Sequence, residues 1–192
     1  MKKILIGTHN RGKFKEISYL ISKKYKKISP ISLSIPSPKE TGKTFSSNSK
    51  LKANFFSKFV DYAVISDDSG LCIKSLNNSP GIYSARLAKK KGSFYKAMKF
   101  ILKKLKDKKD RSAIFVCSLS LKIPKKKLVT VEGKLNGVIS SKISGNRGFG
   151  YDPIFIPKGF KITFGQMAKY KKIKLDHRFL AFKKLKKKIK IL

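Results

Sequence analysis

Short apolar runs alternate along this chain with segments in which apolar residues recur at helical spacing. Residues 4–8 form an apolar run typical of a buried strand, and Phe14, Ile17, Leu20 and Ile21 then follow the spacing of one helical face. Strands are also predicted at residues 63–66, 71–76, 113–121, 128–135 and 151–156. The strands at 113–121 and 128–135 are expected to form an antiparallel hairpin with a turn at 124–126. Intermixed strands and helices predict an α/β fold, with a mixed β-sheet flanked by helices.

Three later helices are predicted from capping residues and apolar spacing. Ser46 or Ser47 can cap the first of them, Ser93 can cap the second over residues 94–105, and the third ends the chain. The apolar faces of the first and the third are Leu51, Phe55, Phe56 and Phe59, and Leu180, Ala181, Leu185 and Ile189. Residues 29–38 contain three prolines and are expected to be irregular.

Length and composition predict one cytoplasmic domain over residues 1–192. The chain has no internal repeat and no long Gly/Ser-rich or Pro-rich linker, and its length is that of an average domain. No apolar stretch approaches the roughly 18 to 20 residues of a membrane span, and the N-terminal run is too short for a signal peptide. Cys72 and Cys117 lie in apolar runs, so both are expected to be core residues in a reducing compartment.

The charge is strongly unbalanced, with 47 basic residues against 10 acidic ones and a formal net charge of +37. A nucleic-acid-binding protein is one interpretation, because a dense positive field gains from releasing the counterions around phosphates. However, only five of the basic residues are arginines, whose planar fork suits specific phosphate and base recognition, and the lysines are spread over the whole chain. We therefore expect a lysine-rich solvated surface without a specific nucleic-acid partner, which would still attract an anionic nucleotide.

Two of the ten acidic residues, Asp67 and Asp68, adjoin at the end of the predicted strand 63–66. Because side chains alternate along a strand, only one of them follows the row that faces a given pocket, unless a turn re-aims the other. Crowded carboxylates repel unless a cation offsets them, and Mg²⁺ binds one or two carboxylates together with phosphate oxygens. The sequence Asp-Ser-Gly at 68–70 equally suits an ordinary turn. Both a Mg²⁺ site and a structural turn stay open on these residues.

The first loop, Gly7-Thr8-His9-Asn10-Arg11-Gly12-Lys13, formally matches the Gly-x-x-x-x-Gly-Lys pattern of a P-loop. Phe14 stands where a P-loop has the Ser or Thr whose hydroxyl binds Mg²⁺, which argues against an ATPase of that class. A strand-to-helix turn still presents backbone N–H groups and the positive end of a helix dipole. The loop predicts either a triphosphate cradle that includes Lys13 or a basic helix start without a ligand.

Two further segments combine aromatic and charged residues. Residues 148–153 read Gly-Phe-Gly-Tyr-Asp-Pro, where glycines beside aromatic rings allow a flat base to approach and stack; the alternative is a β-turn that supplies core aromatic residues. Asp176, His177 and Arg178 lie at or near the start of the last helix, close in sequence to Lys172. This cluster predicts donors to a base carbonyl, with a structural histidine as the alternative.

Six motifs in this order together resemble the inosine triphosphate pyrophosphatase family, the non-canonical purine nucleoside triphosphate pyrophosphatases, over essentially the whole chain. The motifs are Thr8-His9-Asn10-Arg11-Gly12-Lys13, Glu40-Thr41-Gly42-Lys43-Thr44-Phe45 with Asn48 and Lys52, Ser66-Asp67-Asp68-Ser69-Gly70-Leu71, Ser79-Pro80-Gly81-Ile82-Tyr83-Ser84-Ala85-Arg86, Gly148-Phe149-Gly150-Tyr151-Asp152-Pro153, and Thr163-Phe164 to His177-Arg178.

The resemblance implies hydrolysis of ITP, dITP and XTP to the nucleoside monophosphate and pyrophosphate, with a role for each matching position. It implies Asp68 as the general base and, with Glu40, as a ligand of a Mg²⁺ cofactor. The implied substrate-binding positions are Thr8, His9, Asn10, Arg11, Gly12, Lys13 and Lys52 around the phosphates, Ser69 as a further substrate contact, Phe149, Gly150, Tyr151 and Asp152 at the purine and ribose, and Lys172, His177 and Arg178 at the base.

The resemblance also implies a homodimer, and a fold with an elongated mixed sheet and two lobes around a central cleft. The chain departs from the family pattern at Gly165-Gln166-Met167, at Ile173 and at Asp176, where the family often has Ala-Glu-Met, Asn and Ser. The carboxylate of Asp176 beside the implied base-reading residues can tune the base preference. A pyrophosphatase for other modified nucleotides is the nearest alternative, and a basic nucleic-acid-binding protein is the alternative from another class.

Overall fold

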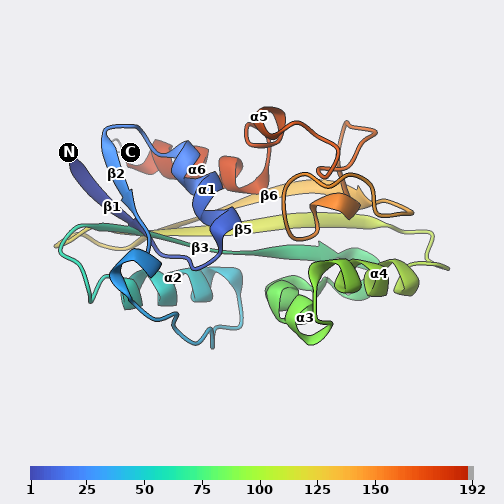
Figure 1. Cartoon of the computed structure of the whole chain (residues 1–192), viewed down its shortest axis with the longest axis horizontal. Coiled ribbons are helices and arrows are strands. Elements are labelled where there is room, and N and C mark those ends of the chain that lie inside the picture. Colours follow the sequence, from blue (N-terminus) through green and yellow to red (C-terminus); the bar gives the residue numbers. More distant parts are fainter. Residues whose placement is uncertain (190–192) are drawn as a thin grey trace. The chain divides into compact units, whose positions relative to one another are not determined.

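The computed structural model describes residues 1–189, in which strands and helices intermix along the chain (Figure 1). The strands are β1 (Lys2–Ile6), β2 (Tyr25–Ile28), β3 (Ala63–Ile73), β4 (Ser79–Pro80), β5 (Ser112–Lys122), β6 (Val129–Ile139) and β7 (Phe155–Pro157). The helices are α1 (Arg11–Leu20), α2 (Phe45–Phe56), α3 (Ser84–Lys90), α4 (Phe94–Lys104), α5 (Lys169–Lys172) and α6 (His177–Lys188). Short 3₁₀ turns are η1 (Ile31–Leu33), η2 (Lys74–Leu76), η3 (Gly81–Tyr83) and η4 (Asp152–Ile154).

The strands form one mixed sheet in the order β2-β1-β3-β5-β6-β7, with β4 paired to β3 outside this path. Strand β1 runs parallel to both β2 and β3, whereas β4 is antiparallel to β3 and β7 is antiparallel to β6. The predicted α/β class with a mixed sheet flanked by helices is confirmed. Within the part of the chain that the structure describes, no helix has the length and hydrophobicity of a membrane span.

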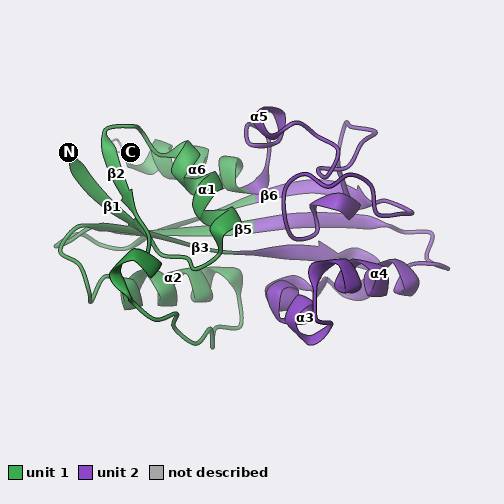
Figure 2. Cartoon of the chain, in the orientation of Figure 1, with its two compact units in different colours: residues 1–68, 117–133, 178–192 green, residues 69–116, 134–177 purple. Residues whose placement is uncertain are grey.

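The chain divides into two compact units, each assembled from separate segments (Figure 2). Unit 1 contains residues 1–68, 117–133 and the chain from Arg178 on, and unit 2 contains residues 69–116 and 134–177. The boundary passes through strand β3 between Asp68 and Ser69, and at the start of helix α6 between His177 and Arg178. The single domain over residues 1–192 stays a prediction.

Unit 1 has an apolar core on each face of its part of the sheet. Ile65 of β3 belongs to the core that also contains Ile17 of α1 and Phe182 of α6, whereas its neighbour Val64 packs with Phe56 of α2. Because side chains alternate along a strand, this packing fixes the directions of the residues that follow. In the part of β3 that belongs to unit 1, odd-numbered positions face α1 and α6, and even-numbered positions face α2.

Unit 2 is organised around one large core. Leu71 and Ile73 of β3 and Phe115 of β5 share it with Ile101 of α4 and with Phe155 and Phe164, all of which are buried. The Phe115 and Phe155 ring centroids are 4.4 Å apart. Cys117 is buried in the core of unit 1, Cys72 is half-buried in unit 2, and the two are not joined in a disulfide.

The predicted break between two strands at residues 67–70 is wrong, because β3 continues without a turn from Ala63 to Ile73. The alternative of an Asp-Ser-Gly turn is therefore wrong as well. Gly70 serves close packing instead: a Cβ atom there would lie 2.2 Å from the Gly81 carbonyl oxygen and 2.6 Å from Ser84 Oγ. That hydroxyl accepts a hydrogen bond from the Leu71 N–H at 2.9 Å, so a side chain at position 70 would force the strand away.

Other predicted boundaries shift for local reasons. Residues 74–76 form the turn η2 instead of continuing the strand, and residues 151–156 contain η4 before the short strand β7. The cap of α2 is Thr44, not Ser46 or Ser47: Thr44 Oγ1 accepts from the Ser47 N–H, and the Ser47 hydroxyl accepts from the Thr44 N–H. The predicted helices after residue 10, after Ser93 and at the end of the chain are confirmed, as is the adjacency of β5 and β6.

Replacing the cap of α2 should cost measurable stability. We expect Thr44→Ala to lower the free energy of unfolding by about 1 kcal/mol, because the Ser47 N–H loses its acceptor. Urea unfolding followed by circular dichroism measures the difference, with Ser46→Ala in the first turn of the same helix as the matched control. Equal stabilities of the two variants would contradict the capping role of Thr44.

Candidate functional site

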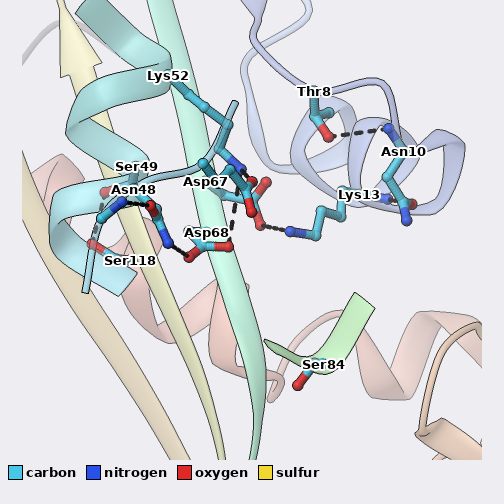
Figure 3. A network of polar contacts seen from close by, with 12 residues as sticks. Thr8, Asn10, Lys13, Asn48, Ser49, Lys52, Asp67, Asp68, Ser84 and Ser118 are labelled. Atoms are coloured by element: carbon cyan, nitrogen blue, oxygen red, sulfur yellow. Dashed lines mark hydrogen bonds and ion pairs between the residues drawn. The ribbon is translucent and has the colours of Figure 1, made fainter. Parts of the chain in front are cut away.

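The adjacent carboxylates of Asp67 and Asp68 lie on opposite faces of β3, and both are buried in unit 1 (Figure 3). Asp67 shares its parity with Ile65 and faces α1 and α6, whereas Asp68 shares its parity with Val64 and faces α2. Alternation thereby separates two like charges that are neighbours in the sequence. The direct contacts of the two carboxylates differ, although the charges of Lys13 and Lys52 act on both.

On the side of Asp67, two cations and a second carboxylate form a buried network. Lys13 Nζ lies 3.2 Å from Asp67 Oδ2, and Arg178 Nε lies 3.6 Å from the same oxygen. Arg178 Nη1 donates to Glu16 Oε2 at 2.7 Å, so Glu16 of α1 holds the guanidinium in place. Burial raises the pKa of Asp67, but the charges of Lys13, Arg178 and Lys52 outweigh it and lower the pKa to about 2. Asp67 is therefore a fixed anion.

On the side of Asp68, a lysine lies between two carboxylates. Lys52 Nζ donates to Glu40 Oε1 at 2.7 Å. The same ammonium lies 4.0 Å from Asp68 Oδ1, and Asn48 Nδ2 donates to Asp68 Oδ2 at 3.1 Å (Figure 3). Burial raises the pKa of Asp68 although the charges of Lys13 and Lys52 lower it. Burial lowers the pKa of Lys52, but Asp67, Asp68 and Glu40 raise it above its ordinary value. Glu40 and Asp68 therefore both lie near the ammonium group of Lys52.

The loop after β1 opens α1 in the predicted strand-turn-helix arrangement. Asn10 is the N-cap: its Oδ1 accepts the Lys13 N–H at 3.0 Å, and its own N–H donates to Thr8 Oγ1 at 3.2 Å. His9 Nε2 lies 2.9 Å from the Ile35 carbonyl oxygen, which ties the loop to the segment before α2. The N–H groups of Arg11 and Gly12 stand in the first turn of α1, where a helix offers donors to an anion.

Gly7 brings this loop close to β3. Its N–H donates to the Ile65 carbonyl oxygen at 2.7 Å, and a Cβ atom at position 7 would lie 2.2 Å from Ser66 Oγ and 2.5 Å from the Phe56 ring. A glycine is needed here because the loop packs directly on strand and helix. The close approach keeps Thr8 and Asn10 beside the strand that carries the two aspartates.

Unit 2 contains a second group of predicted site residues. Lys172 Nζ donates to Asp152 Oδ2 at 2.6 Å, and the same oxygen accepts the Phe149 N–H at 2.8 Å. The ammonium lies 5.0 Å from the centroid of the Phe149 ring and 5.4 Å from that of Phe164. Asp152 and Phe149 therefore hold Lys172 in one position although it is buried.

The other predicted residues of unit 2 are placed differently. His177 stacks on Phe115, with ring centroids 4.7 Å apart and an interplanar angle of 11°. Tyr151 is a core residue: its ring packs edge-on against Phe94, its hydroxyl donates to the Ser84 carbonyl oxygen at 2.8 Å, and burial raises its pKa. The loop before it is a tight turn, in which Gly150 has a φ of +67°.

Known proteins match this chain along nearly its entire length. The model of the Ham1 family matches residues 4–188. The chain belongs to the Ham1 family.

Several known proteins match the chain nearly end to end. It is 42% identical over 192 residues to the dITP/XTP pyrophosphatase of Oceanobacillus iheyensis, covering 97% of this chain and 98% of that protein. It is 39% identical over 186 residues to the dITP/XTP pyrophosphatase of Caulobacter vibrioides, covering 96% of each. Among solved structures, the Staphylococcus aureus Ham1 protein superposes with a TM-score of 0.87 at 35% identity and 98% coverage of both chains. The Ham1 fold is thus shared over the full length.

Within this Ham1 chain, the predicted site residues fall into the two units. Unit 1 brings together the loop at 8–13, Glu40, Lys52, Asp68 and Arg178, and unit 2 contains Ser69 of β3, residues 149–152, Lys172 and His177. Arg178 was expected with Lys172 and His177 at the base, and its contacts in the structure include the carboxylates of Glu16 and Asp67. Its role at the base stays a prediction, as do the roles of the other site residues.

The sequence left a Mg²⁺ site open on Asp67 together with Asp68, named Asn48 only as part of a motif, and assigned no role to Glu16; the structure places all three in these networks. Glu16 follows Lys13 by three residues, and Asn48 precedes Lys52 by four, so each shares a helix face with a predicted site residue. That spacing is the signal that could have identified Glu16 and Asn48. Across residues 1–189, no three His, Cys, Asp or Glu side chains are grouped so as to hold a metal ion by themselves.

The low pKa of Asp67 predicts a pH-dependent contribution to stability. A carboxyl whose pKa falls from 3.8 to about 2 on folding stabilises the protein above its unfolded-state pKa, and this contribution is lost as the pH falls toward 2. Asp67→Asn should therefore be less stable than the wild type at pH 6. The difference in the free energy of unfolding should become smaller between pH 5 and pH 3. Urea unfolding at each pH measures it, with exposed Asp61→Asn as the control. A difference in the free energy of unfolding that does not change with pH would contradict the stabilising role of the ionised Asp67.

Proposed function

We propose that this Ham1-family chain hydrolyses non-canonical purine nucleoside triphosphates, namely ITP, dITP and XTP, to the nucleoside monophosphate and pyrophosphate. The observation that carries the proposal is the pair Glu40 and Asp68 on either side of Lys52 Nζ, with Asp67, the neighbour of Asp68 on β3, paired to Lys13 of α1. The names of the relatives from Oceanobacillus iheyensis and Caulobacter vibrioides, both dITP/XTP pyrophosphatases, support the same activity. Removal of such nucleotides protects the nucleotide pool.

In the proposed reaction, water attacks the α-phosphorus and pyrophosphate leaves. Asp68 accepts the proton of the attacking water, and a carboxyl whose pKa is raised by burial is a better base than an exposed one. The bond from the α-phosphorus to the bridging oxygen breaks, and that oxygen leaves with the pyrophosphate. Lys13, Lys52 and the first N–H groups of α1 stabilise the negative charge on the phosphates.

The residues present fit a Mg²⁺ ion. Glu40 and Asp68 supply two carboxylates that share one cation, Lys52, and Mg²⁺ is usually held by one or two carboxylates together with substrate phosphates. Such a set needs no third protein carboxylate. When bound there, the ion would supply charge stabilisation to the phosphates and lower the pKa of bound water.

We assign recognition of the base to the group in unit 2. Lys172 is a donor fixed by Asp152, and His177 is held by stacking on Phe115. Donors of this kind match the 6-oxo group of hypoxanthine or xanthine, whereas the 6-amino group of adenine is itself a donor and would leave them unpaired. A mismatch of this type can be worth a factor of roughly 10⁴ or more. Phe149 offers a ring face to the purine.

A substrate panel tests the function. With Mg²⁺, we expect pyrophosphate from ITP, dITP and XTP and little turnover of ATP, and we expect Asp68→Asn to lower kcat about 10²- to 10⁴-fold because the proton acceptor is lost. Exposed Asp61→Asn is the matched control and should keep the wild-type rate. Release of orthophosphate from ATP, with no pyrophosphate from the 6-oxo purine nucleotides, would rule the function out.

The proposed enzyme is a cytoplasmic homodimer without a specific nucleic-acid partner. Two copies that each carry +37 repel one another, so the dimer should tighten as salt screens the charge. Sedimentation equilibrium at roughly 50 mM and 500 mM NaCl measures this, since the Debye length falls to a few ångströms at high salt. A monomer at both salt concentrations would contradict the homodimer, and dissociation by salt would contradict the repulsion.

A further inference from the structure

Asn48 is fully buried in α2 and bonds at both ends of its side-chain amide. Its Nδ2 donates to Asp68 Oδ2 at 3.1 Å, and its Oδ1 accepts the Gly42 N–H at 2.8 Å. Gly42 lies two residues after Glu40 in the chain. One amide therefore connects the strand that carries Asp68 to the segment that carries Glu40.

The two contacts leave only one orientation for the amide. The Gly42 N–H can only donate, so it requires the carbonyl oxygen of Asn48, and the NH₂ group is then directed at Asp68. A carboxylate at position 48 would keep the bond to Gly42 but would repel Asp68, and an aliphatic side chain would lose both bonds. The arrangement is specific to an amide of this length.

The orientation of the Asn48 amide also decides which oxygen of Asp68 accepts its hydrogen bond and which one faces Lys52. Oδ2 is engaged by Asn48, and Oδ1 faces Lys52 at 4.0 Å, whose ammonium contacts Glu40. Asn48 and Lys52 are four residues apart and share one face of α2, so the helix presents an amide to one oxygen and an ammonium to the other. The carboxylate plane is held by these two side chains.

We propose that Asn48 is a positioning residue that sets the relative placement of the Asp68 and Glu40 carboxylates for the reaction. This inference rests on the proposed function. Asn48 touches neither the phosphates nor the attacking water in this role; it acts through Asp68 on one side and through the backbone of the Glu40 segment on the other. Partners of this kind are worth about 10- to 100-fold in activity or metal affinity.

The packing around Asn48 limits how far either partner can move. A Cβ atom at Gly42 would lie 2.5 Å from Asn48 Oδ1 and 2.9 Å from the Asn48 backbone nitrogen, so the segment approaches the helix as closely as a glycine allows. The next residue, Ser49, bonds separately to β5, with its Oγ 3.0 Å from Ser118 Oγ and 2.8 Å from Ser120 Oγ. The packing thus holds Asn48 in one position relative to Asp68 and to the segment that carries Glu40.

Three variants separate positioning from folding. Asn48→Ala removes both bonds, and Asn48→Asp keeps the acceptor for Gly42 but replaces the donor to Asp68 with a like charge. Gly42→Ala keeps the amide of residue 48 and displaces the segment from the other side, because its Cβ atom would lie 2.3 Å from Ser47 Oγ and 2.5 Å from Asn48 Oδ1 at a half-buried position. Ser49→Ala is the matched control, since it removes a fully buried hydroxyl from the next residue of the same helix without touching Asp68.

Two readouts are measured on each folded variant. Steady-state kinetics with ITP and Mg²⁺ should show kcat lowered about 10- to 100-fold in all three variants with KM within about threefold, because the phosphate cradle is intact. Titration of Mn²⁺ in the presence of α,β-methylene-ITP, followed by electron paramagnetic resonance, should show a similar weakening of Mn²⁺ binding. Ser49→Ala should keep both values within about threefold even if its melting temperature falls.

The outcomes distinguish this inference from the proposed function. A wild type that releases no pyrophosphate from any 6-oxo purine triphosphate overturns the function and this inference with it. An active wild type whose Asn48→Ala and Gly42→Ala variants keep both kcat and Mn²⁺ affinity overturns the role of Asn48 alone. Losses as large in Ser49→Ala would reduce Asn48 to a structural residue and also overturn the proposal. If Asn48→Ala does not fold, Gly42→Ala decides.

Discussion

The alternation of side chains along β3 is the constraint on which the rest of the site depends. Asp67 and Asp68 are neighbours in sequence, and two buried like charges on one face would repel strongly. The extended backbone directs them to opposite faces, where their direct contacts differ: Lys13 and Arg178 for Asp67, and Lys52 and Asn48 for Asp68. The charges of Lys13 and Lys52 act on both carboxylates. The same pair in a turn would have no such separation.

This separation gives the two carboxylates different chemistry. Asp67 meets two cations and has a pKa of about 2, so it stays an anion and anchors Lys13. Asp68 has a raised pKa, and its Oδ1 lies 4.0 Å from Lys52 Nζ, the ammonium that also contacts Glu40; the proposed role of Asp68 as a base rests on this environment. Strand geometry and burial thus shift the pKa values of two aspartates in opposite directions.

Local patterns predicted most of the elements but not the contacts between distant segments. Apolar spacing identified α1, α4 and α6 and the neighbouring strands β5 and β6, because each depends on residues a few positions apart. The continuity of β3 could not be predicted from its own residues, since it depends on the approach of Gly81 and Ser84 to Gly70. The contact of Arg178 with Glu16 likewise joins positions 162 residues apart, beyond the reach of any local pattern.

The scarce acids have a consequence for the stability of the whole molecule. Of the ten, Glu16, Asp67, Asp68, Asp152 and Asp176 are buried, so half of the acidic side chains lie inside, and the first four of these pair with lysine or arginine side chains. The lysine-rich exterior is left with few counter-charges, and a net charge this far from zero strains the compact state through self-repulsion. An engineer could therefore neutralise outer lysines to relieve that strain while leaving the interior electrostatics of the molecule as they are.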